Sequence, residues 1–148
     1  MSNENLRGVT YMKEYKRLPE SELILMRIIW DAKEPVSSLY IMDKLKDEKT
    51  WTITTVLNLL ARLVNKGFLT SERHGKANTY AAVVEEEPYL EIESRSFLSR
   101  VHGNSLTSLM ASLINGKSIT QKDIEELKKF IDKNSSDEGS FDETSNKE

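Results

Sequence analysis

Hydrogen-bonding side chains lie at helical spacing between Trp51 and Gly67, on the faces that an apolar stripe leaves free. They are Thr54, Thr55, Asn58 and Arg62. The stretch contains no acidic residue. Hydroxyl and amide groups bond phosphate oxygens or base edges, and an arginine neutralises a phosphate or bonds guanine. This combination indicates a helix that contacts nucleic acid.

A basic turn follows this stretch. The sequence His74-Gly75-Lys76-Ala77 separates residues 68–73 from residues 78–83, and both flanking stretches are enriched in β-branched and aromatic residues. Glycine suits a turn position with positive φ, so the pattern predicts a β-hairpin. Arg73 and Lys76 then lie at its tip, where they could reach the DNA backbone or the minor groove.

Three helices are predicted to position these groups, because apolar residues recur at three- and four-residue steps over residues 19–32, 38–46 and 53–66. Ser37 or Ser38 is the expected cap of the second helix, and Thr52 of the third. Gly67 suits the residue just after the third helix. Three helices followed by a hairpin predict a winged helix-turn-helix.

The sequence after the hairpin predicts a second, helical region. The acidic run at residues 85–87 and Pro88 read as a solvated linker, and helices are expected over residues 89–102, 105–115 and 121–132. Thr120 and Asp123 have the spacing of a capping box. The predicted fold is therefore mainly α with a small β-hairpin, and the winged-helix domain spans residues 18–84 and the helical domain residues 85–133.

Two terminal segments are expected to lie outside these domains. Residues 1–17 hold few apolar groups and read as a flexible arm, or as an extension upstream of a start at Met12. Residues 134–148 carry five acidic residues and one basic residue. Such a segment buries too little apolar surface to offset its ordering entropy, so a disordered acidic tail is predicted.

Composition narrows the classes of protein. A chain of 148 residues with 38% hydrophobic content can bury one ordinary core, or two small ones that a partner stabilises. Cysteine is absent, which excludes disulfides and thiolate metal sites and fits a reducing cytoplasm. Charges interrupt every hydrophobic run, so a cytoplasmic chain without a membrane partner is predicted. Residues 1–83 carry a net charge of +3 and residues 84–148 of -6, which predicts different roles for the halves.

No pattern indicates catalysis or a cofactor. There is no Ser-His-Asp set, phosphate-binding glycine loop or dinucleotide fingerprint, so we predict no catalytic residues and no enzyme. His74 and His102 have no second ligand at metal-binding spacing, and no metal site is predicted. Trp30 and Trp51 are expected to anchor the core rather than to stack on a ligand.

Three stretches, "LPESELILMRIIWDA", "WTITTVLNLLARLVNKGFL" and "KANTYAAVVEEE", resemble the penicillinase-repressor family of bacterial winged-helix repressors. The resemblance extends from Leu18 to Ile131. Its most specific part is the pattern matched by Trp51, Thr52, Thr55-Val56, Leu59-Leu60, Arg62-Leu63 and Lys66-Gly67. Leu57 stands where relatives often carry a basic or polar residue.

The resemblance implies a homodimer on a dyad-symmetric DNA operator. The DNA contacts it implies are Thr52, Thr54, Thr55, Asn58 and Arg62 on the recognition helix and Arg73 and Lys76 on the wing. The segment "FLSRVHGNSLTSLMASLI" resembles the dimerisation region, with Phe97, Leu98, Val101, Leu106, Leu109, Leu113 and Ile114 in the interface. Narrow apolar helices of this kind cannot bury themselves alone.

The resemblance also implies how repression ends. Family members that control β-lactam resistance are inactivated by proteolysis, commonly at an Asn-Phe bond, and the aligned bond here joins Ser112 to Leu113. Copper-responsive members carry a cysteine-rich metal motif that this chain lacks. A signal-activated protease is therefore an expected partner, and genes of β-lactamase or antibiotic resistance are the expected targets.

These observations predict a homodimeric transcriptional repressor that inserts the helix over residues 53–66 into the major groove. The alternative is a winged helix that binds proteins and has no sequence-specific affinity for DNA. The two differ in the salt dependence of DNA binding, because phosphate contacts release counterions and contacts between apolar faces do not.

Overall fold

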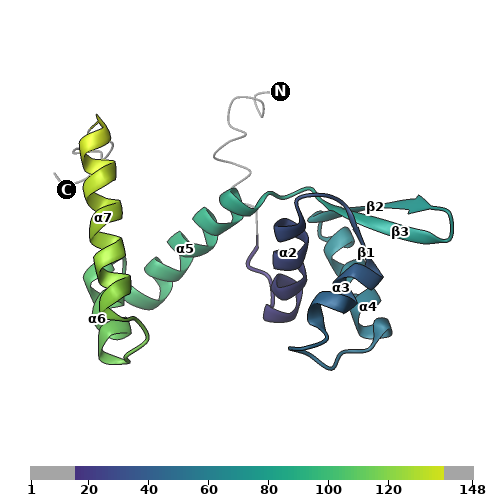
Figure 1. Cartoon of the computed structure of the whole chain (residues 1–148), viewed down its shortest axis with the longest axis horizontal. Helices are drawn as coiled ribbons and strands as arrows, with labels where there is room; N and C mark the ends of the chain where they lie inside the picture. Colours follow the sequence, from purple (N-terminus) through teal and green to yellow (C-terminus); the bar gives the residue numbers. More distant parts are fainter. Residues whose placement is uncertain (1–15, 139–148) are drawn as a thin grey trace. The chain divides into compact units, whose positions relative to one another are not determined.

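The computed structural model describes residues 16–138, and the predictions for residues 1–15 and 139–148 lie outside the described residues. Two compact units are distinguished, one ending at Ser96 and one beginning at Phe97. The elements, labelled in Figure 1, are α2 (Glu20–Ala32), β1 (Val36–Ser37), α3 (Ser38–Leu45), α4 (Ile53–Asn65), β2 (Leu69–His74), β3 (Ala77–Ala82), α5 (Glu86–His102), α6 (Leu106–Asn115) and α7 (Gln121–Glu138).

Local sequence signals set the ends of α3 and α4. Ser37 Oγ accepts a hydrogen bond from the N–H of Tyr40 over 3.2 Å, and Thr52 Oγ1 accepts one from the N–H of Thr55 over 3.2 Å. Gly67 follows α4 with a φ of +85°, a conformation that costs glycine little. The predicted caps are confirmed, and the predicted bounds of α2, α3 and α4 differ from the observed ones by one residue each.

A three-stranded antiparallel sheet of order β1-β3-β2 completes the first unit. The predicted hairpin is confirmed, but its turn is shorter than expected. His74 pairs with Ala77, so only Gly75 and Lys76 form the turn, and Gly75 has a φ of +66°. The long β2-β3 hairpin extends away from the three helices as a wing (Figure 1).

The sequence did not predict β1. Val36 pairs with Tyr80 and Ser37 with Thr79, and these two residues alone form the strand. Two residues are too few to show an alternating pattern, so their pairing depends on a distant segment of the chain. With this addition, the predicted class is confirmed: a mainly helical chain with a winged helix-turn-helix and further helices after it.

The core of the first unit gathers buried apolar residues from every element between Leu18 and Tyr89. Trp30 is buried, and its Nε1–H donates to the carbonyl of Val84 over 2.9 Å. Trp51 is half-buried and packs against the edge of the core. Both tryptophans are therefore core residues, as predicted.

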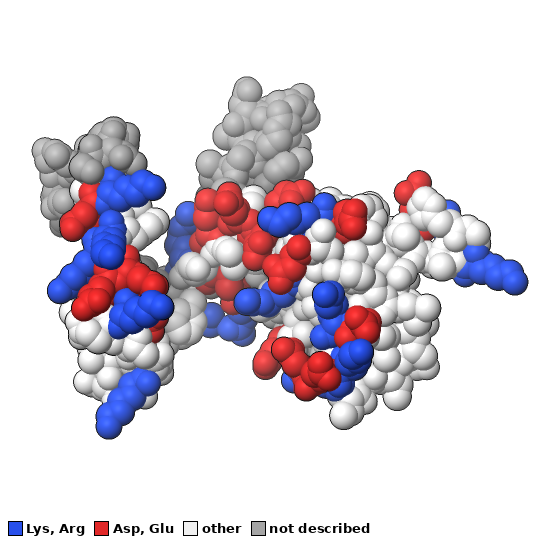
Figure 2. Space-filling view, viewed as in Figure 1, with Lys and Arg blue, Asp and Glu red and all other residues white. Residues whose placement is uncertain are grey.

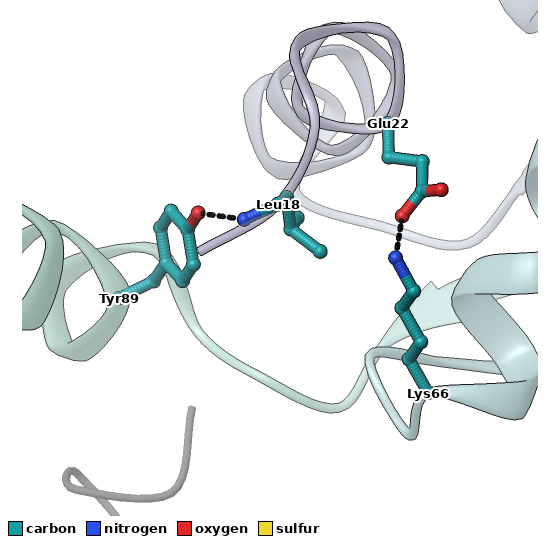
Figure 3. A network of polar contacts seen from close by, with 4 residues as sticks. All are labelled: Leu18, Glu22, Lys66 and Tyr89. Atoms are coloured by element: carbon teal, nitrogen blue, oxygen red, sulfur yellow. Dashed lines mark hydrogen bonds and ion pairs between the residues drawn. The ribbon is translucent and has the colours of Figure 1, made fainter. Parts of the chain in front are cut away.

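The first turns of α5 belong to the winged unit. Tyr89 is buried with its ring centroid 5.7 Å from that of Trp30 and 5.8 Å from that of Phe68, and its hydroxyl accepts the N–H of Leu18 over 2.8 Å (Figure 3). This packing explains why the division between the units falls after Ser96, within α5, whereas the sequence placed the domain boundary at residue 84.

The prediction that the acidic run is a linker is wrong in part, because Glu86 and Glu87 lie in the first turn of α5. Pro88 was predicted to lie in the same linker. In a first turn, however, its missing N–H has no intrahelical partner to lose, and acidic residues there oppose the positive end of the helix dipole.

The second unit contains the end of α5 together with α6 and α7. Ser105 Oγ caps α6 by accepting the N–H of Ser108 over 3.0 Å. The predicted capping box is confirmed, since Thr120 N–H donates to Asp123 Oδ2 over 2.8 Å and Asp123 N–H to Thr120 Oγ1 over 3.1 Å.

The predicted disordered tail is wrong for its first residues, because α7 continues through Glu138. No proline or glycine interrupts the sequence between Gly116 and Gly139, so nothing stops the helix at Lys133.

Candidate nucleic-acid interface

Helix α4 presents an outer face of unpartnered polar side chains. Its apolar stripe is fully buried or nearly so: Val56, Leu59, Leu60 and Leu63. Helical periodicity therefore turns Thr54, Asn58 and Arg62 outward, and all three are exposed. Within residues 16–138, their side chains make no hydrogen bond or ion pair. Their donors and acceptors are available to a ligand.

The two other threonines of this face are engaged with each other. Thr52 Oγ1 accepts the backbone N–H of Thr55, and the two hydroxyl oxygens lie 3.2 Å apart. Thr55 is half-buried, whereas Thr52 is exposed. Both were predicted as contacts, and the structure places both at the start of α4, where the Thr52 hydroxyl caps the helix and donates to the Thr55 hydroxyl.

The wing brings Arg73 and Lys76 to its tip. Arg73 Nε donates to the carbonyl of Gly75 over 3.0 Å, which holds the guanidinium against the turn and leaves its two terminal nitrogens free of that bond. Lys76 is exposed in the turn itself. On the same strand as Arg73, His74 Nε2 lies 3.6 Å from Glu72 Oε1. The tip is thus basic, with one acidic side chain at its base.

Backbone hydrogen bonds fix the wing to α4. Phe68 N–H donates to the carbonyl of Leu63 over 2.9 Å, and Val83 N–H donates to the carbonyl of Phe68 over 2.8 Å. Leu69, the first residue of β2, is buried. Because these contacts bridge the end of α4 and both strands, helix and hairpin present their exposed groups as one rigid surface.

A partly buried ion pair holds α4 against α2. Glu22 is 2% exposed, and its Oε1 lies 2.5 Å from Nζ of Lys66, the residue that caps α4 at its C-terminus (Figure 3). Among the described residues, Glu22 is the only buried charged side chain. A buried carboxylate is tolerated only with such a partner, so the pair positions α4 on the core.

The charge distribution of the first unit favours an anion at this face. No acidic residue lies on α4. In Figure 2, basic side chains occupy the end of the hairpin, and the surface below it is largely uncharged. The free N–H groups and partial positive charge at the start of α4 add to the attraction for phosphate.

The residues described in the structure offer little to other chemistries. No group of three or more His, Asp or Glu side chains among them could hold a metal ion. His102 lies in the second unit, where its Nδ1 is 2.9 Å from Ser108 Oγ. None of the described helices is both long enough and apolar enough to cross a membrane.

The family model described as "Penicillinase repressor" matches residues 18–133. The chain belongs to the penicillinase repressor family.

Two relatives and one solved structure are similar to this chain. The chain is 26% identical to the penicillinase repressor of Bacillus licheniformis over 121 residues, which cover 82% of this chain and 94% of the relative. It is 28% identical over 116 residues to the methicillin resistance regulatory protein MecI of Staphylococcus aureus, covering 78% and 94%. The solution structure of the DNA binding domain of the repressor BlaI is 27% identical with a TM-score of 0.44, covering 49% of this chain and 88% of that one.

The family-like stretch from Trp51 to Gly67 divides into two roles in the structure. Val56, Leu59, Leu60 and Leu63 are buried in the core, and Lys66 pairs with Glu22. The remaining polar members occupy the outer face. The resemblance alone did not separate these roles, because it gives spacing and not burial.

Sequence reasoning missed several residues beside this face. Lys49 lies with Nζ 5.8 Å from the ring centroid of Trp51, just before α4, and Lys44 lies 5.3 Å from that of exposed Tyr40 on α3. Both lysines belong to the stretch KLKDEK, whose acidic residues made it look like a mixed-charge loop and not a basic patch. Glu22 was detectable, because a glutamate four residues before Met26 occupies the buried stripe of α2.

The predicted dimer residues lie on α5 and α6 and are incompletely buried. Phe97, Val101, Leu106 and Ile114 are exposed, and Leu98, Leu109 and Leu113 are half-buried. Among the described residues, none after Tyr89 is buried. On α7, exposed apolar groups at Leu127, Phe130 and Ile131 add to this surface, and they were not predicted as interface residues. The Ser112–Leu113 bond lies inside α6, with Ser112 exposed.

Proposed function

We propose that this chain is a transcriptional repressor that binds a DNA operator as a homodimer. The observation that carries the proposal is the outer face of α4, where Thr54, Asn58 and Arg62 are exposed without partners on a helix free of acidic residues. A face that served solubility alone would more commonly carry Glu and Lys in paired positions. Family membership supports the same function.

In the proposed complex, α4 lies in the major groove. Thr54 and Asn58 contact base edges, and Arg62 contacts a phosphate or a guanine. The hydroxyl of Thr52 caps α4 and donates to that of Thr55, so we assign these two residues to phosphate contacts at the backbone N–H groups of the first turn. Arg73 and Lys76 contact the flanking backbone or the minor groove from the wing.

The homodimer is assigned to the C-terminal helices. Their apolar side chains stay exposed or half-buried within one chain, and a second copy would cover them. The proposed interface consists of Phe97, Leu98, Val101, Leu106, Leu109, Leu113 and Ile114. Two winged units joined in this way bind two half-sites of a dyad-symmetric operator, which lie about one helical turn or a multiple of it apart.

The names of the relatives suggest the regulated genes. One relative is a penicillinase repressor and another a regulator of methicillin resistance, so genes of β-lactam resistance are the proposed targets. Release by a signal-activated protease at Ser112–Leu113 would separate the winged unit from α7. Because this bond lies inside α6, cleavage requires local unwinding of the helix.

The test of DNA binding is selection of bound duplexes from a random pool with the full-length protein, followed by affinity for the selected duplex across a salt series. We expect a dyad-symmetric motif and a steep loss of affinity with salt. Asn58→Asp places a carboxylate on the outer face of α4 and should abolish binding. Asn104→Asp makes the same change in the second unit and should not. Failure to enrich any motif would favour the protein-binding alternative.

The proteolytic step is tested separately in cells that express the chain. Exposure to a β-lactam should produce a fragment that ends at Ser112, detected by immunoblot and mass spectrometry. Intact protein throughout derepression of the regulated genes would refute the cleavage and leave the repressor function standing.

A further inference from the structure

Leu57 is an apolar side chain on the outer face of α4. It is 42% exposed and lies next to Thr54 and Ala61 on the helix surface, which are three residues before and four after it, and Asn58 follows it in the chain. All three neighbours are exposed as well. Leu57 is therefore not part of the buried stripe that holds α4 to the core.

A single exposed leucine is common and needs no explanation by itself. The position of Leu57 does, because its neighbours are the side chains assigned to base edges. A leucine cannot donate a hydrogen bond to a phosphate or to guanine. Among the groups that bases present in the major groove, the C5-methyl group of thymine is the apolar one.

We propose that Leu57 is a specificity-determining residue that contacts a thymine methyl group in the major groove. The inference rests on the proposed function, and it adds the base that this position selects. Asn58 supplies the adjoining contact, because an asparagine bonds the N6 and N7 atoms of adenine bidentately, and the thymine paired with that adenine carries its methyl group on the same groove edge.

The helix geometry allows one A·T pair, or two neighbouring pairs, to receive both side chains. Successive residues of an α-helix are separated by about 1.5 Å along the axis and about 100° around it. Leu57 and Asn58 therefore point about a quarter turn apart, and both lie outside the buried stripe of α4. In the described part of the chain, the Asn58 side chain makes no hydrogen bond or ion pair, and Leu57 is not among the residues that pack against the core.

Another protein is the competing occupant of this surface. A single leucine among hydroxyl and amide groups is far smaller than the apolar centre of a stable protein interface. The absence of acidic residues on α4 also has no purpose in such an interface. DNA accounts for both features.

The experiment uses the full-length protein and its selected operator, with each thymine replaced in turn by deoxyuridine, which lacks only the methyl group. We expect one thymine in each half-site at which this replacement weakens binding by about three- to fivefold, the cost of exposing one methyl group. Leu57→Ala should bind the thymine and uracil operators equally at that position. Val83→Ala, which alters another exposed apolar residue of the winged unit, should keep the preference for thymine.

Each outcome decides one question. Sequence-specific binding that is insensitive to uracil at every thymine, or a sensitivity that survives in Leu57→Ala, overturns the role of Leu57 and leaves the repressor function intact. No enriched motif overturns the proposed function itself. The uracil series with the unaltered protein does not depend on the folding of any variant.

Discussion

The winged unit and the C-terminal helices solve the burial of apolar side chains in different ways. Between Leu18 and Tyr89, residues from helices and strands enclose one core, and a partly buried ion pair and two buried aromatic hydrogen bonds complete it. Among the described residues after Tyr89, apolar side chains are no more than half-buried. The first unit therefore has a buried core of its own, whereas the described part of the second unit leaves its apolar side chains exposed or half-buried.

This difference assigns DNA contact to the winged unit and dimerisation to the C-terminal helices. The winged unit can hold α4 and the wing rigid without help, because backbone hydrogen bonds and packing link them. The C-terminal helices have correct local caps at Ser105 and Thr120 but lack a core of their own. Local signals therefore start these helices, and we infer that a second copy stabilises their packing.

The largest expected effect comes from a charge in the C-terminal helices. Leu109→Asp places a carboxylate in the proposed dimer interface, so it should produce monomers whose operator affinity is lower by about 100-fold or more through loss of linkage between half-sites. Sedimentation gives the oligomeric state, and a titration with the selected operator gives the affinity.

Thr107→Asp, an exposed position on the same helix, is the matched control and should leave the dimer intact. If Leu109→Asp remained a dimer, the second unit would not depend on a partner copy through this face of α6.

The next effect tests the winged unit alone. Lys66→Met leaves Glu22 buried without a counter-charge and should lower the free energy of unfolding by about 3 kcal/mol. Glu22→Gln leaves Lys66, which is 42% exposed and can be hydrated, so its cost should be about 1 kcal/mol. Urea unfolding followed by tryptophan fluorescence measures both, because Trp30 and Trp51 lie in this unit. If both substitutions lowered the free energy of unfolding equally, the loss would not come from leaving the buried Glu22 carboxylate without its partner.

A third substitution separates DNA binding from both folding and assembly. Arg62→Ala should weaken operator binding by roughly 1–3 kcal/mol, and it should reduce the salt dependence if the contact is to a phosphate. Arg27→Ala, an exposed arginine on α2, is the control. An Arg62→Ala dimer of normal stability and unchanged affinity would remove Arg62 from the interface.

The smallest effect concerns Tyr89, where the two regions meet along the chain. Burial raises the pKa of this phenol from its ordinary value of 10.0, and the N–H of Leu18, which donates to the hydroxyl, opposes the shift. The unfolded chain therefore loses this proton at lower pH than the folded chain. The contribution of Tyr89 to stability is full below pH 10 and is lost as pH rises through the raised pKa.

Tyr89→Phe should lower stability by about 1 kcal/mol at neutral pH through loss of the hydrogen bond. It should also reduce the alkaline loss of stability. Urea unfolding at neutral pH and above pH 10 measures both effects. An identical pH dependence in the variant would show that Tyr89 does not control alkaline unfolding.

The sequence predicted the elements whose signals are local. The caps at Thr52 and Ser37, the glycine after α4, and the helical stripe of α4 were all readable, because a helix is specified by neighbours within a few residues. The polar outer face of α4 followed from the same periodicity. Its roles in DNA contact stay predictions until the binding experiments are made.

What only the tertiary structure decided are pairings between distant segments. Strand β1 exists because Val36 meets Tyr80, Glu22 is buried because Lys66 reaches it, and the start of α5 belongs to the winged unit because Tyr89 enters the core. Periodicity reports which residues share a face and does not report what covers that face. For the same reason, only the folded unit showed that Leu57 is exposed on the same outer side of α4 as Thr54 and Asn58.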